Sequence, residues 1–332
     1  MKTTMRAAVL EAVNTPLVLR EVPVPAAGPG QVLVHIAASG INPLDAKVAA
    51  GEAAHANTTL PAILGMDVAG TIAAVGANVE NLRVGDAVYG MVGGFGGIPG
   101  SLAEFGVFDA ALLARKPNNL TMREAAALPL IFITAWEGLV DHANVQPGQK
   151  VLIHGGAGGV GHVAVQLAIA RGADVYATGS AEQKDMIERF GATAIDYRKE
   201  TVEQYVARCT DGEGFDIVYD TVGGATLDAS FIAARTYKGH VVSCLGRGMY
   251  NLTPLSFRAA TYSGVFTLLP LLTGKGRAHH GAIMQEATKL AEQGKLNVNV
   301  DQQHFTLATA ANAHAALANG TARGKLVVEV EE

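Results

Sequence analysis

The chain has 332 residues, enough for about two domains; 49% of them are hydrophobic and only 17% are charged, which excludes a disordered chain or a coiled coil. The net charge of −5, without any run of Lys or Arg, argues against a surface for nucleic acid or for an anionic membrane. The two cysteines, Cys209 and Cys244, cannot build a disulfide framework or a cysteine-rich zinc site.

The N-terminal third of the chain predicts short strands without intervening helices. Met1–Arg20 carries charges and a proline and lacks the apolar segment of a signal peptide, so we expect a cytoplasmic protein. Short β-branched runs follow, bounded by Gly and Pro turns: Val32–Ala37, Asp67–Val75, Ala87–Tyr89 and Leu102–Val107. This pattern is typical of an antiparallel, barrel-like domain.

A helical pattern begins at Thr121, which has the capping-box partner Glu124 three residues later. Strands and helices then alternate. The expected strands are Val151–His154, Asp174–Thr178, Ala194–Tyr197, Phe215–Thr221 and His240–Leu245, and the helices between them include Val160–Ala170 and Glu182–Phe190. This alternation predicts a doubly wound parallel sheet, so the fold class is α/β.

The alternation ends near Gly276. The apolar stretch Gly264–Leu272 is too short to span a bilayer and contains a proline. A helix is expected at about Ala282–Gln293, and residues 324–328 resemble a closing strand. Because a terminal strand after such a core often returns to the first domain, we predict a discontinuous domain of residues 1–127 and 277–332 around a second domain of residues 128–276.

The most informative segment is the glycine-rich turn after the strand that ends at His154. Gly156, Gly158 and Gly161 fit the pattern G-x-G-x-x-G between an apolar strand and a helix. Glycines at these places permit a tight turn, close approach of a pyrophosphate and close helix–strand packing, and the helix N-terminus favours phosphate. The segment therefore predicts a dinucleotide site.

The end of the next strand indicates which dinucleotide is bound. An NAD site normally has an acid there for the ribose hydroxyls, but residues 178–180 are Thr, Gly and Ser. Ser180 and the nearby Lys184 could instead hold the 2′-phosphate of NADPH. The alternative is that Ser180 caps a helix and Lys184 is a solvated helical lysine. The missing acid favours NADPH.

With these motifs the chain resembles a medium-chain dehydrogenase/reductase, specifically the zinc-independent quinone oxidoreductase (zeta-crystallin-like) branch. The resemblance covers essentially the whole chain. It is carried by Gly40–Asp45, Pro61–Gly70, Val84–Val88, Ala157–Gly161, Asp196-Tyr197 and Gly324-Lys325. It implies an N-terminal GroES-like β-barrel domain for substrate and catalysis, a Rossmann NADP-binding domain, and a substrate cleft between them.

The resemblance also bears on zinc. The zinc alcohol dehydrogenases have ligands where this chain has Asn42 and Met66, and a third ligand near Leu130. A catalytic zinc needs three protein ligands, so we expect no metal site. Without a metal ion as Lewis acid, a simple carbonyl group is hard to reduce. A quinone or an enone delocalises the negative charge that arrives with the hydride, so it is the class of substrate that the sequence predicts.

The resemblance further implies the site residues. The expected catalytic residues are Asn42, Asp45, Lys47 and Thr134; the expected cofactor-binding residues are Gly156, Ala157, Gly158, Gly159, Val160, Gly161, Ser180, Lys184, Tyr197, Thr221, Cys244, Leu245, Gly246, Phe266 and Lys325. Each has an ordinary alternative: Tyr197 as a strand-end aromatic, Thr134 as a residue that bonds its own helix, Cys244 as a small core residue.

The chain departs from the family where some quinone reductases have tyrosines near the substrate, since Lys47 and Ala53 stand there. Asp45 and Lys47 could form a relay to the substrate or only a surface ion pair. The proton donor therefore stays open, and solvent could protonate the product.

These features predict an NADPH-dependent quinone or enone reductase that uses no metal. The alternatives are an acyl-thioester or aldehyde reductase, or an alcohol dehydrogenase-like enzyme, on the same scaffold, and a non-catalytic NADPH-binding sensor. We expect a homodimer, by analogy with the family, and no nucleic-acid or membrane partner.

Overall fold

The computed structural model describes residues 3–330, so the outermost ends of the expected first domain lie outside the described residues. The chain forms two compact units. Unit 1 comprises Met1–Leu130, Leu268–Gln293 and Val298–Glu332, and unit 2 comprises Ile131–Thr267 and Gly294–Asn297. The sequence placed the boundaries after residues 127 and 276, whereas the units change after residues 130 and 267. The segment that follows Thr267 thus belongs to unit 1.

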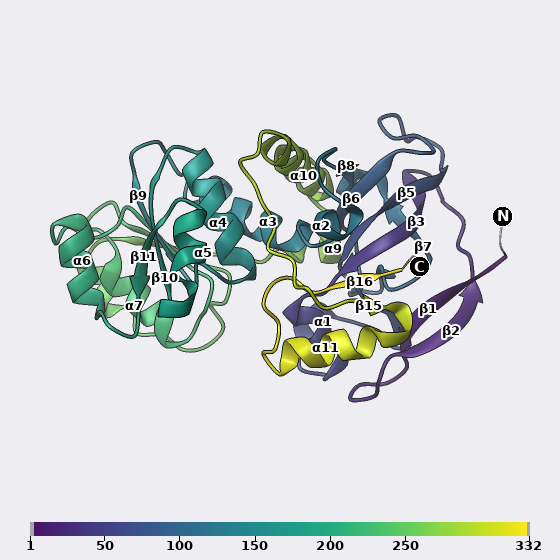
Figure 1. Cartoon of the computed structure of the whole chain (residues 1–332), viewed down its shortest axis with the longest axis horizontal. Helices are drawn as coiled ribbons and strands as arrows, with labels where there is room; N and C mark the ends of the chain where they lie inside the picture. Colours follow the sequence, from purple (N-terminus) through teal and green to yellow (C-terminus); the bar gives the residue numbers. More distant parts are fainter. Residues whose placement is uncertain (1–2, 331–332) are drawn as a thin grey trace. The chain divides into compact units, whose positions relative to one another are not determined.

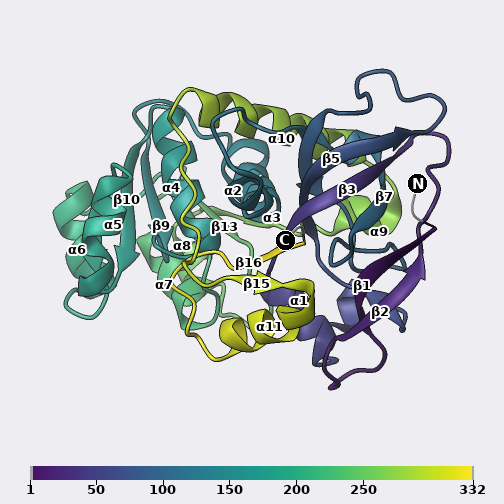
Figure 2. The same ribbon diagram turned by 45° about the vertical axis from the view of Figure 1, so that its right-hand side comes forward.

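Unit 1 is built on two mostly antiparallel sheets (Figures 1 and 2). The smaller sheet has the order β2-β1-β4, with β1 at Thr4–Leu10, β2 at Val18–Pro23 and β4 at Ala62–Ile63. The larger has the order β15-β16-β3-β5-β6-β8, with β7 also paired to β3. Its strands are β3 Gln31–Gly40, β5 Asp67–Val75, β6 Ala87–Met91, β7 Phe105–Asp109, β8 Ala114–Arg115, β15 Phe305–Thr306 and β16 Val327–Glu329.

The strand positions in unit 1 follow the predicted pattern with two differences. The run Leu102–Val107 is a strand only from Phe105, because residues before it bond to other partners: Leu102 N donates to Leu64 O at 3.0 Å. Strands β1, β2, β4 and β8 were not predicted. The closing strand β16 pairs antiparallel with β3, so the end of the chain returns to the first unit as the sequence indicated.

Helices cover the sheets of unit 1. They are α1 Pro43–Ala49, α2 Met122–Ala126, α9 Leu269–Thr273, α10 Arg277–Glu292 and α11 Ala310–Ala318, with 3-10 turns at Ala54–Ala56, Ala110–Leu112 and Leu307–Thr309. The capping box of α2 is confirmed, since Thr121 N donates to the Glu124 carboxylate at 2.8 Å. α1 lies beside α11 (Figure 2). The buried Tyr89 hydroxyl donates to Met284 O at 2.8 Å, which fastens α10 to β6.

Unit 2 contains the predicted doubly wound parallel sheet, with the order β11-β10-β9-β12-β13-β14 (Figure 1). Its strands are β9 Lys150–His154, β10 Asp174–Gly179, β11 Thr193–Asp196, β12 Ile217–Asp220, β13 His240–Ser243 and β14 Thr261–Gly264. Its helices are α4 Gly159–Ala170, α5 Lys184–Arg189, α6 Val202–Thr210, α7 Ala225–Ala233 and α8 Thr253–Phe257, with a 3-10 turn at Ala181–Gln183. Helix α3 (Pro129–Trp136) begins in unit 1 and ends in unit 2, where a π-helical turn, η3 (Glu137–His142), follows.

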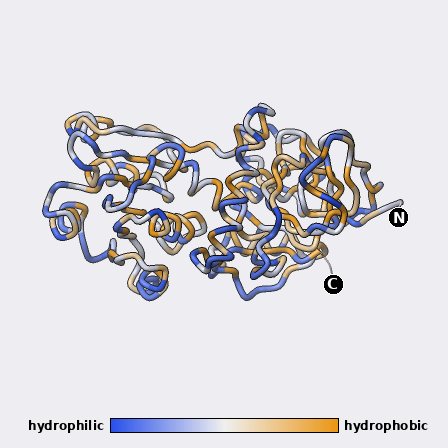
Figure 3. The backbone as a smooth tube through the Cα atoms, turned by 90° about the horizontal axis from the view of Figure 1, so that it is seen from above, coloured by the Kyte–Doolittle hydropathy of each residue, from blue (hydrophilic) through white to orange (hydrophobic). Residues whose placement is uncertain are grey.

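The core of unit 2 fixes the positions of the strand ends. Leu152, Val218 and Val241 from three adjacent strands pack with Phe215 and Phe231, all at most 1% exposed. Each large apolar side chain buried in this way contributes roughly 1.5–3 kcal/mol. Figure 3 shows hydrophobic stretches, in orange, alternating with hydrophilic ones, in blue, along the backbone of both units. The apolar strands thus hold their carboxyl ends in register, which is where ligands of such sheets bind.

Candidate functional site

The loop between β9 and α4 has the glycine geometry that a dinucleotide site needs. Gly155, which the motif did not include, makes the tight turn with a φ of 74°. A Cβ on Gly156 would lie 2.5 Å from the Ala177 Cβ, and one on Gly161 would lie 2.0 Å from Gly155 O. These two glycines therefore let the loop pack tightly against β10 and against itself.

Gly158 leaves the start of α4 open. It is exposed, it is the N-cap residue of α4, and no side chain caps the helix there. The N-terminal N–H groups of the helix and the positive end of its dipole therefore face outward beside Gly159 and Val160. This cradle fits the pyrophosphate of a dinucleotide.

Polar groups at the ends of β9, β10 and β12 hold the glycine loop in place, and of these the sequence indicated only Thr221. Gly156 N donates to Thr178 O at 2.9 Å, and Gly155 N donates to the Thr178 hydroxyl at 3.1 Å. Thr221 is an expected cofactor residue, and its hydroxyl donates to His154 O at 2.6 Å. Burial lowers the pKa of His154 to about 4, so its ring is neutral beneath the loop. For His154 and Thr178, the only signal in the sequence is their position at the ends of predicted strands.

The ends of β10 and β11 bring two predicted residues together. Gly179 is paired in parallel with Asp196, so Ser180 and Tyr197 follow side by side. Ser180 is half-buried and Tyr197 is 54% exposed. A hydrogen bond from Ser180 and the N-terminus of its own turn lower the pKa of Glu182. This edge of the sheet is where a Rossmann site receives the ribose.

Of the cations near this edge, only Lys184 was predicted. The amino group of Lys184 is 3.8 Å from the Glu188 carboxylate, on the exposed face of α5. Arg198 Nη1 is 3.8 Å from the Glu182 carboxylate, and its guanidinium carbon lies 5.6 Å from the centre of the Tyr197 ring. The structure therefore adds Arg198 to Ser180 and Tyr197, whereas Lys184 pairs along its own helix.

The carboxyl ends of β12 and β13 form a second group of expected cofactor residues. Asp220 is fully buried and accepts from Gly223 N at 2.9 Å and from the Ser243 hydroxyl at 2.7 Å. The Ser243 hydroxyl accepts in turn from Leu245 N at 3.1 Å, which fixes the segment Cys244–Gly246. Burial raises the pKa of Cys244 to about 12, so its thiol stays protonated and unreactive.

Beyond β14, Phe266 is 45% exposed and the adjacent Thr267 is buried. The Thr267 hydroxyl lies 3.1 Å from the hydroxyl of Thr134, another predicted residue, which is also buried. Unit 2 thus holds Thr134 and all the predicted cofactor residues except Lys325.

The other predicted residues belong to unit 1, where three of them form a buried cluster with Asp67. Asn42 Nδ2 donates to the Asp67 carboxylate at 2.8 Å, and the Asn42 side-chain oxygen accepts from Lys325 Nζ. Lys325 Nζ also donates to Ile41 O at 2.8 Å. Both ends of the Asn42 amide are therefore engaged inside the unit.

Asp45 stabilises the start of α1 in the same cluster. Its carboxylate accepts from Asn42 N at 2.9 Å and from Gly65 N at 3.2 Å. Burial raises the pKa of Asp45 to about 7 and that of Asp67 to about 6, and burial lowers the pKa of Lys325. Lys47 is exposed on the other side of α1. The structure therefore does not bring Asp45 and Lys47 together, either as a relay or as a surface ion pair.

The positions of the family's zinc ligands offer little to a metal. Met66 is fully buried, the Asn42 amide is bonded to Asp67 and Lys325, and Leu130 contributes its backbone N–H to Asp67 at 2.9 Å. Within residues 3–330 there is no group of three or more His, Cys, Asp or Glu side chains that could hold a metal ion.

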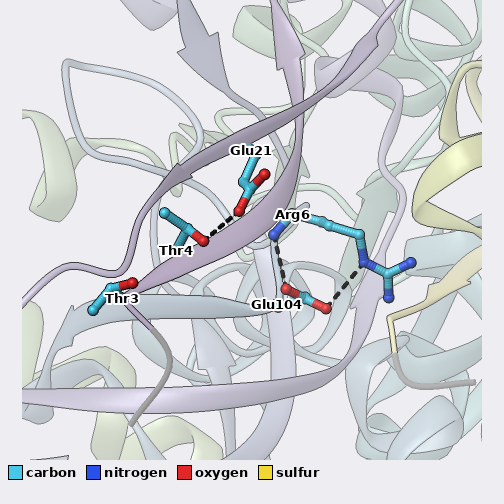
Figure 4. Close-up of a pocket in the computed structure, with 5 residues that line it drawn as sticks. All are labelled: Thr3, Thr4, Arg6, Glu21 and Glu104. Carbon is cyan, nitrogen blue, oxygen red and sulfur yellow. Dashed lines mark hydrogen bonds and ion pairs between the residues drawn. The ribbon is translucent and has the colours of Figure 1, made fainter.

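A depression of about 370 Å³ on unit 1 lies apart from these residues (Figure 4). It is lined by Thr3, Thr4, Arg6, Glu21 and Glu104. Arg6 pairs with Glu104 at 3.0 Å, and the Thr4 hydroxyl donates to Glu21. Because these polar groups bond to one another, we assign the depression no ligand.

Comparisons with known proteins agree with this architecture. Residues 28–118 match the alcohol dehydrogenase GroES-like domain, and residues 190–328 match the zinc-binding dehydrogenase family. The chain is 34% identical over 306 residues to a 2-methylene-furan-3-one reductase from Solanum lycopersicum, covering 90% of this chain and 71% of that protein. It belongs to the medium-chain dehydrogenase/reductase superfamily.

Other members of the superfamily have similar names and folds. A chloroplastic NADPH-dependent alkenal/one oxidoreductase from Arabidopsis thaliana is 34% identical, with 90% of this chain and 72% of that protein covered. An alcohol dehydrogenase superfamily protein from Novosphingobium aromaticivorans is 55% identical with a TM-score of 0.97, covering 99% of this chain and all of the other. The quinone oxidoreductase from Coxiella burnetii is 28% identical with a TM-score of 0.81, with the same coverage.

This dehydrogenase/reductase is therefore an oxidoreductase, and its fold implies a nicotinamide cofactor. The GroES-like and Rossmann-like expectations for the two parts are confirmed. No helix in the described part of the chain combines the length and the apolar character needed to cross a bilayer.

Proposed function

We propose that this dehydrogenase/reductase transfers a hydride from NADPH to a quinone or to an alkene conjugated with a carbonyl group. The observation that carries the proposal is the edge formed by Ser180, which follows β10, and by Tyr197 and Arg198, which follow the neighbouring β11: a hydroxyl and a cation lie there instead of the acid of an NAD site. Relatives named as alkenal/one and furanone reductases support the acceptor class.

Glu182 does not oppose this cofactor choice. Its carboxylate already interacts with the Ser180 hydroxyl and lies 3.8 Å from Arg198. A 2′-phosphate brings more negative charge and more acceptor oxygens than a carboxylate, so it competes well for the same two groups.

The proposed roles follow from the contacts in each unit. The N–H groups at the start of α4 bind the pyrophosphate, and His154, Thr178 and Thr221 hold that loop in place. The exposed side chains of Leu245 and Phe266, from the ends of β13 and β14, provide an apolar face for the nicotinamide. When bound, the cofactor supplies the hydride.

We propose that no metal takes part. The side chains at positions 42, 66 and 130 support this, because an engaged amide and two apolar side chains make poor zinc ligands. A quinone or an enone delocalises the negative charge that arrives with the hydride, so positioning and hydrogen bonds suffice. The acceptor gains a hydride and, from water, a proton, which balances the reaction.

A panel of acceptors tests the proposed function: a benzoquinone, a naphthoquinone, an enal, an enone and crotonyl-CoA, each with NADPH and with NADH. We expect oxidation of NADPH by quinones or enones and slower oxidation of NADH. Turnover confined to crotonyl-CoA would move the protein to the acyl-thioester reductases. Tight NADPH binding without any turnover would indicate a sensor.

Two copies of the chain are proposed to pair through unit 2. Strand β14 ends the sheet order, so one of its edges has no partner strand among residues 3–330. Exposed apolar side chains lie in the segments just before it, with Met249 at 100% and Phe257 at 85% exposure. Such an edge is suited to pairing with a second copy. Residence in the cytoplasm and the absence of nucleic-acid and membrane partners stay predictions.

A further inference from the structure

Tyr219 connects the segments that hold the predicted nicotinamide residues, although it is itself completely buried. Its hydroxyl, from β12, donates to Thr134 O on α3 at 2.6 Å. It also interacts with the Cys244 thiol, which follows β13 and itself donates to Asp220 O at 3.8 Å. Burial raises the pKa of the Tyr219 hydroxyl well above its usual value, so the hydroxyl keeps its proton and acts as a donor.

The turn that follows the helix with Thr134 leaves room for the Tyr219 side chain. After α3 the chain widens into the π-helical turn η3, in which Ala143 N donates to Gly138 O, five residues back, at 3.0 Å. A Cβ on Gly138 would lie 2.7 Å from Tyr219 Cζ and 2.9 Å from its hydroxyl oxygen. A glycine is therefore required where the tyrosine ring meets the turn. Widened turns of this kind occur frequently at functional sites.

The hydrogen bond from Tyr219 also affects the position of the paired hydroxyls of Thr134 and Thr267. Thr134 is anchored through its carbonyl by Tyr219, and its own hydroxyl lies 3.1 Å from that of Thr267, next to the exposed Phe266. One phenol group thus connects β12, the end of β13 and α3, and through Thr134 it reaches the end of β14.

We propose that Tyr219 is a positioning residue: it holds the Thr134–Thr267 hydroxyl pair and the Cys244 segment in the arrangement that fixes the reduced nicotinamide ring for hydride transfer. This inference rests on the proposed placement of the nicotinamide at the ends of β13 and β14. Tyr219 does not itself touch the cofactor, because no part of it reaches the surface.

The test compares wild type, Tyr219→Phe and the matched control Tyr205→Phe, which removes a hydroxyl from another buried tyrosine of the same unit. The first readout is binding of whichever reduced cofactor wild type binds, NADPH or NADH, followed by the fluorescence lifetime of the bound nicotinamide. We expect Tyr219→Phe to keep the dissociation constant within about twofold, because the phosphates bind elsewhere, and to shift the lifetime toward that of free cofactor. Tyr205→Phe should change neither quantity.

The second readout is the rate with a reactive acceptor. We expect Tyr219→Phe to lower kcat about tenfold with little change in the KM for the cofactor, as for loss of one buried hydrogen bond that orients a reacting group. Thr134→Val combined with Tyr219→Phe should be slowed by less than the product of the two separate losses, because both changes disturb the same hydroxyl pair. Independent, multiplying losses would contradict this.

The outcomes separate this inference from the proposed function. A lower melting temperature of Tyr219→Phe, with unchanged lifetime and rate, would show a purely structural tyrosine and overturn the inference. If wild type binds the cofactor but does not oxidise it with any of the acceptors, the proposed function fails. The comparison of fluorescence lifetimes still decides the role of Tyr219.

Discussion

At the scale of single residues, the proposed preference for NADPH depends on the cation beside Tyr197. Arg198 lies over the Tyr197 ring and near Glu182, while Lys184 pairs with Glu188 along α5. A guanidinium also matches a phosphate with several N–H groups at once, which an ammonium cannot do. Arg198 is therefore the stronger candidate for the 2′-phosphate.

The first prediction follows from this difference. Arg198→Ala should raise the NADPH dissociation constant about tenfold, the loss expected for one charge-assisted hydrogen bond, and leave NADH binding nearly unchanged. Lys184→Ala should have the same selectivity with a smaller effect. Arg171→Ala, which removes an exposed cation at the C-terminal end of α4, is the control. Equal losses for NADPH and NADH, measured by fluorescence titration, would remove both residues from the phosphate site.

Asp45 should make the stability of the fold depend on pH. Its pKa is raised by burial from 3.8 to about 7 in the folded chain, so between these values the unfolded chain is ionised while the folded chain keeps the proton. The contribution of Asp45 to the free energy of unfolding is fully present below about pH 4. It is lost as the pH rises to about 7, by at most about 1.4 kcal/mol per pH unit.

Urea unfolding between pH 5 and pH 7 tests this prediction. Wild type should lose stability relative to Asp45→Asn as the pH rises, because the amide cannot ionise. Asp185→Asn, at an exposed position on α5, should leave the slope unchanged. Parallel pH profiles for wild type and Asp45→Asn would show that Asp45 is ionised in the folded chain.

Sequence motifs indicated some of the candidate site residues and could not indicate others. Gly158, Ser180 and Tyr197 occupy motif positions, and the structure places them at strand and helix ends as expected for that fold. The sequence did not indicate Arg198, or the contacts of Thr178 with the glycine loop, because these depend on the pairing of β9, β10 and β11, which brings together residues distant in sequence. Whether Asn42 and Lys325 also contact cofactor or substrate stays a prediction.

At the scale of elements, the β9–α4 loop contains glycines that its packing requires and one glycine, Gly158, for which we propose a role in binding. A Cβ on Gly161 would meet Gly155 O at 2.0 Å, whereas one on the exposed Gly158 would approach Gly155 O at only 3.1 Å. Gly161→Ala should therefore lower both the melting temperature and cofactor affinity, at a cost of about 1–3 kcal/mol of stability. Gly158→Ala should keep the melting temperature and weaken cofactor binding about tenfold by crowding the phosphates. Wild-type affinity in Gly158→Ala would place the pyrophosphate elsewhere.

The elements that were predicted share a clear burial pattern. β9, β12 and β13 have continuous apolar runs because both faces of the central sheet are covered, which makes them recognisable. β2 and β14 are mostly exposed edge strands with polar residues, so no periodic apolar signal marks them. Because the connection around Gly276 is rich in glycine, the sequence pattern did not show where α10 begins. It begins at Arg277, five residues before the predicted start.

At the scale of the whole molecule, pairing through β14 should be visible as a doubled mass. Light scattering should give wild type twice the chain mass of 34.3 kDa. Replacing Met249 and Phe257 together by Asp should give the single-chain mass without loss of stability, because both side chains are exposed in the single chain. Val84→Asp, at an exposed apolar position of unit 1, is the control. A wild type of single-chain mass would exclude the dimer.

The measurement that tests the central claim most directly follows deuterium from NADPH labelled at C4 of the nicotinamide into an enone product, after treatment of the protein with a zinc chelator. Metal-independent hydride transfer predicts one deuterium on the β-carbon of the product, none on the α-carbon, and a rate that the chelator does not change. A reaction that stops with the chelator and returns with stoichiometric zinc, or a product without deuterium on the β-carbon, would contradict the account.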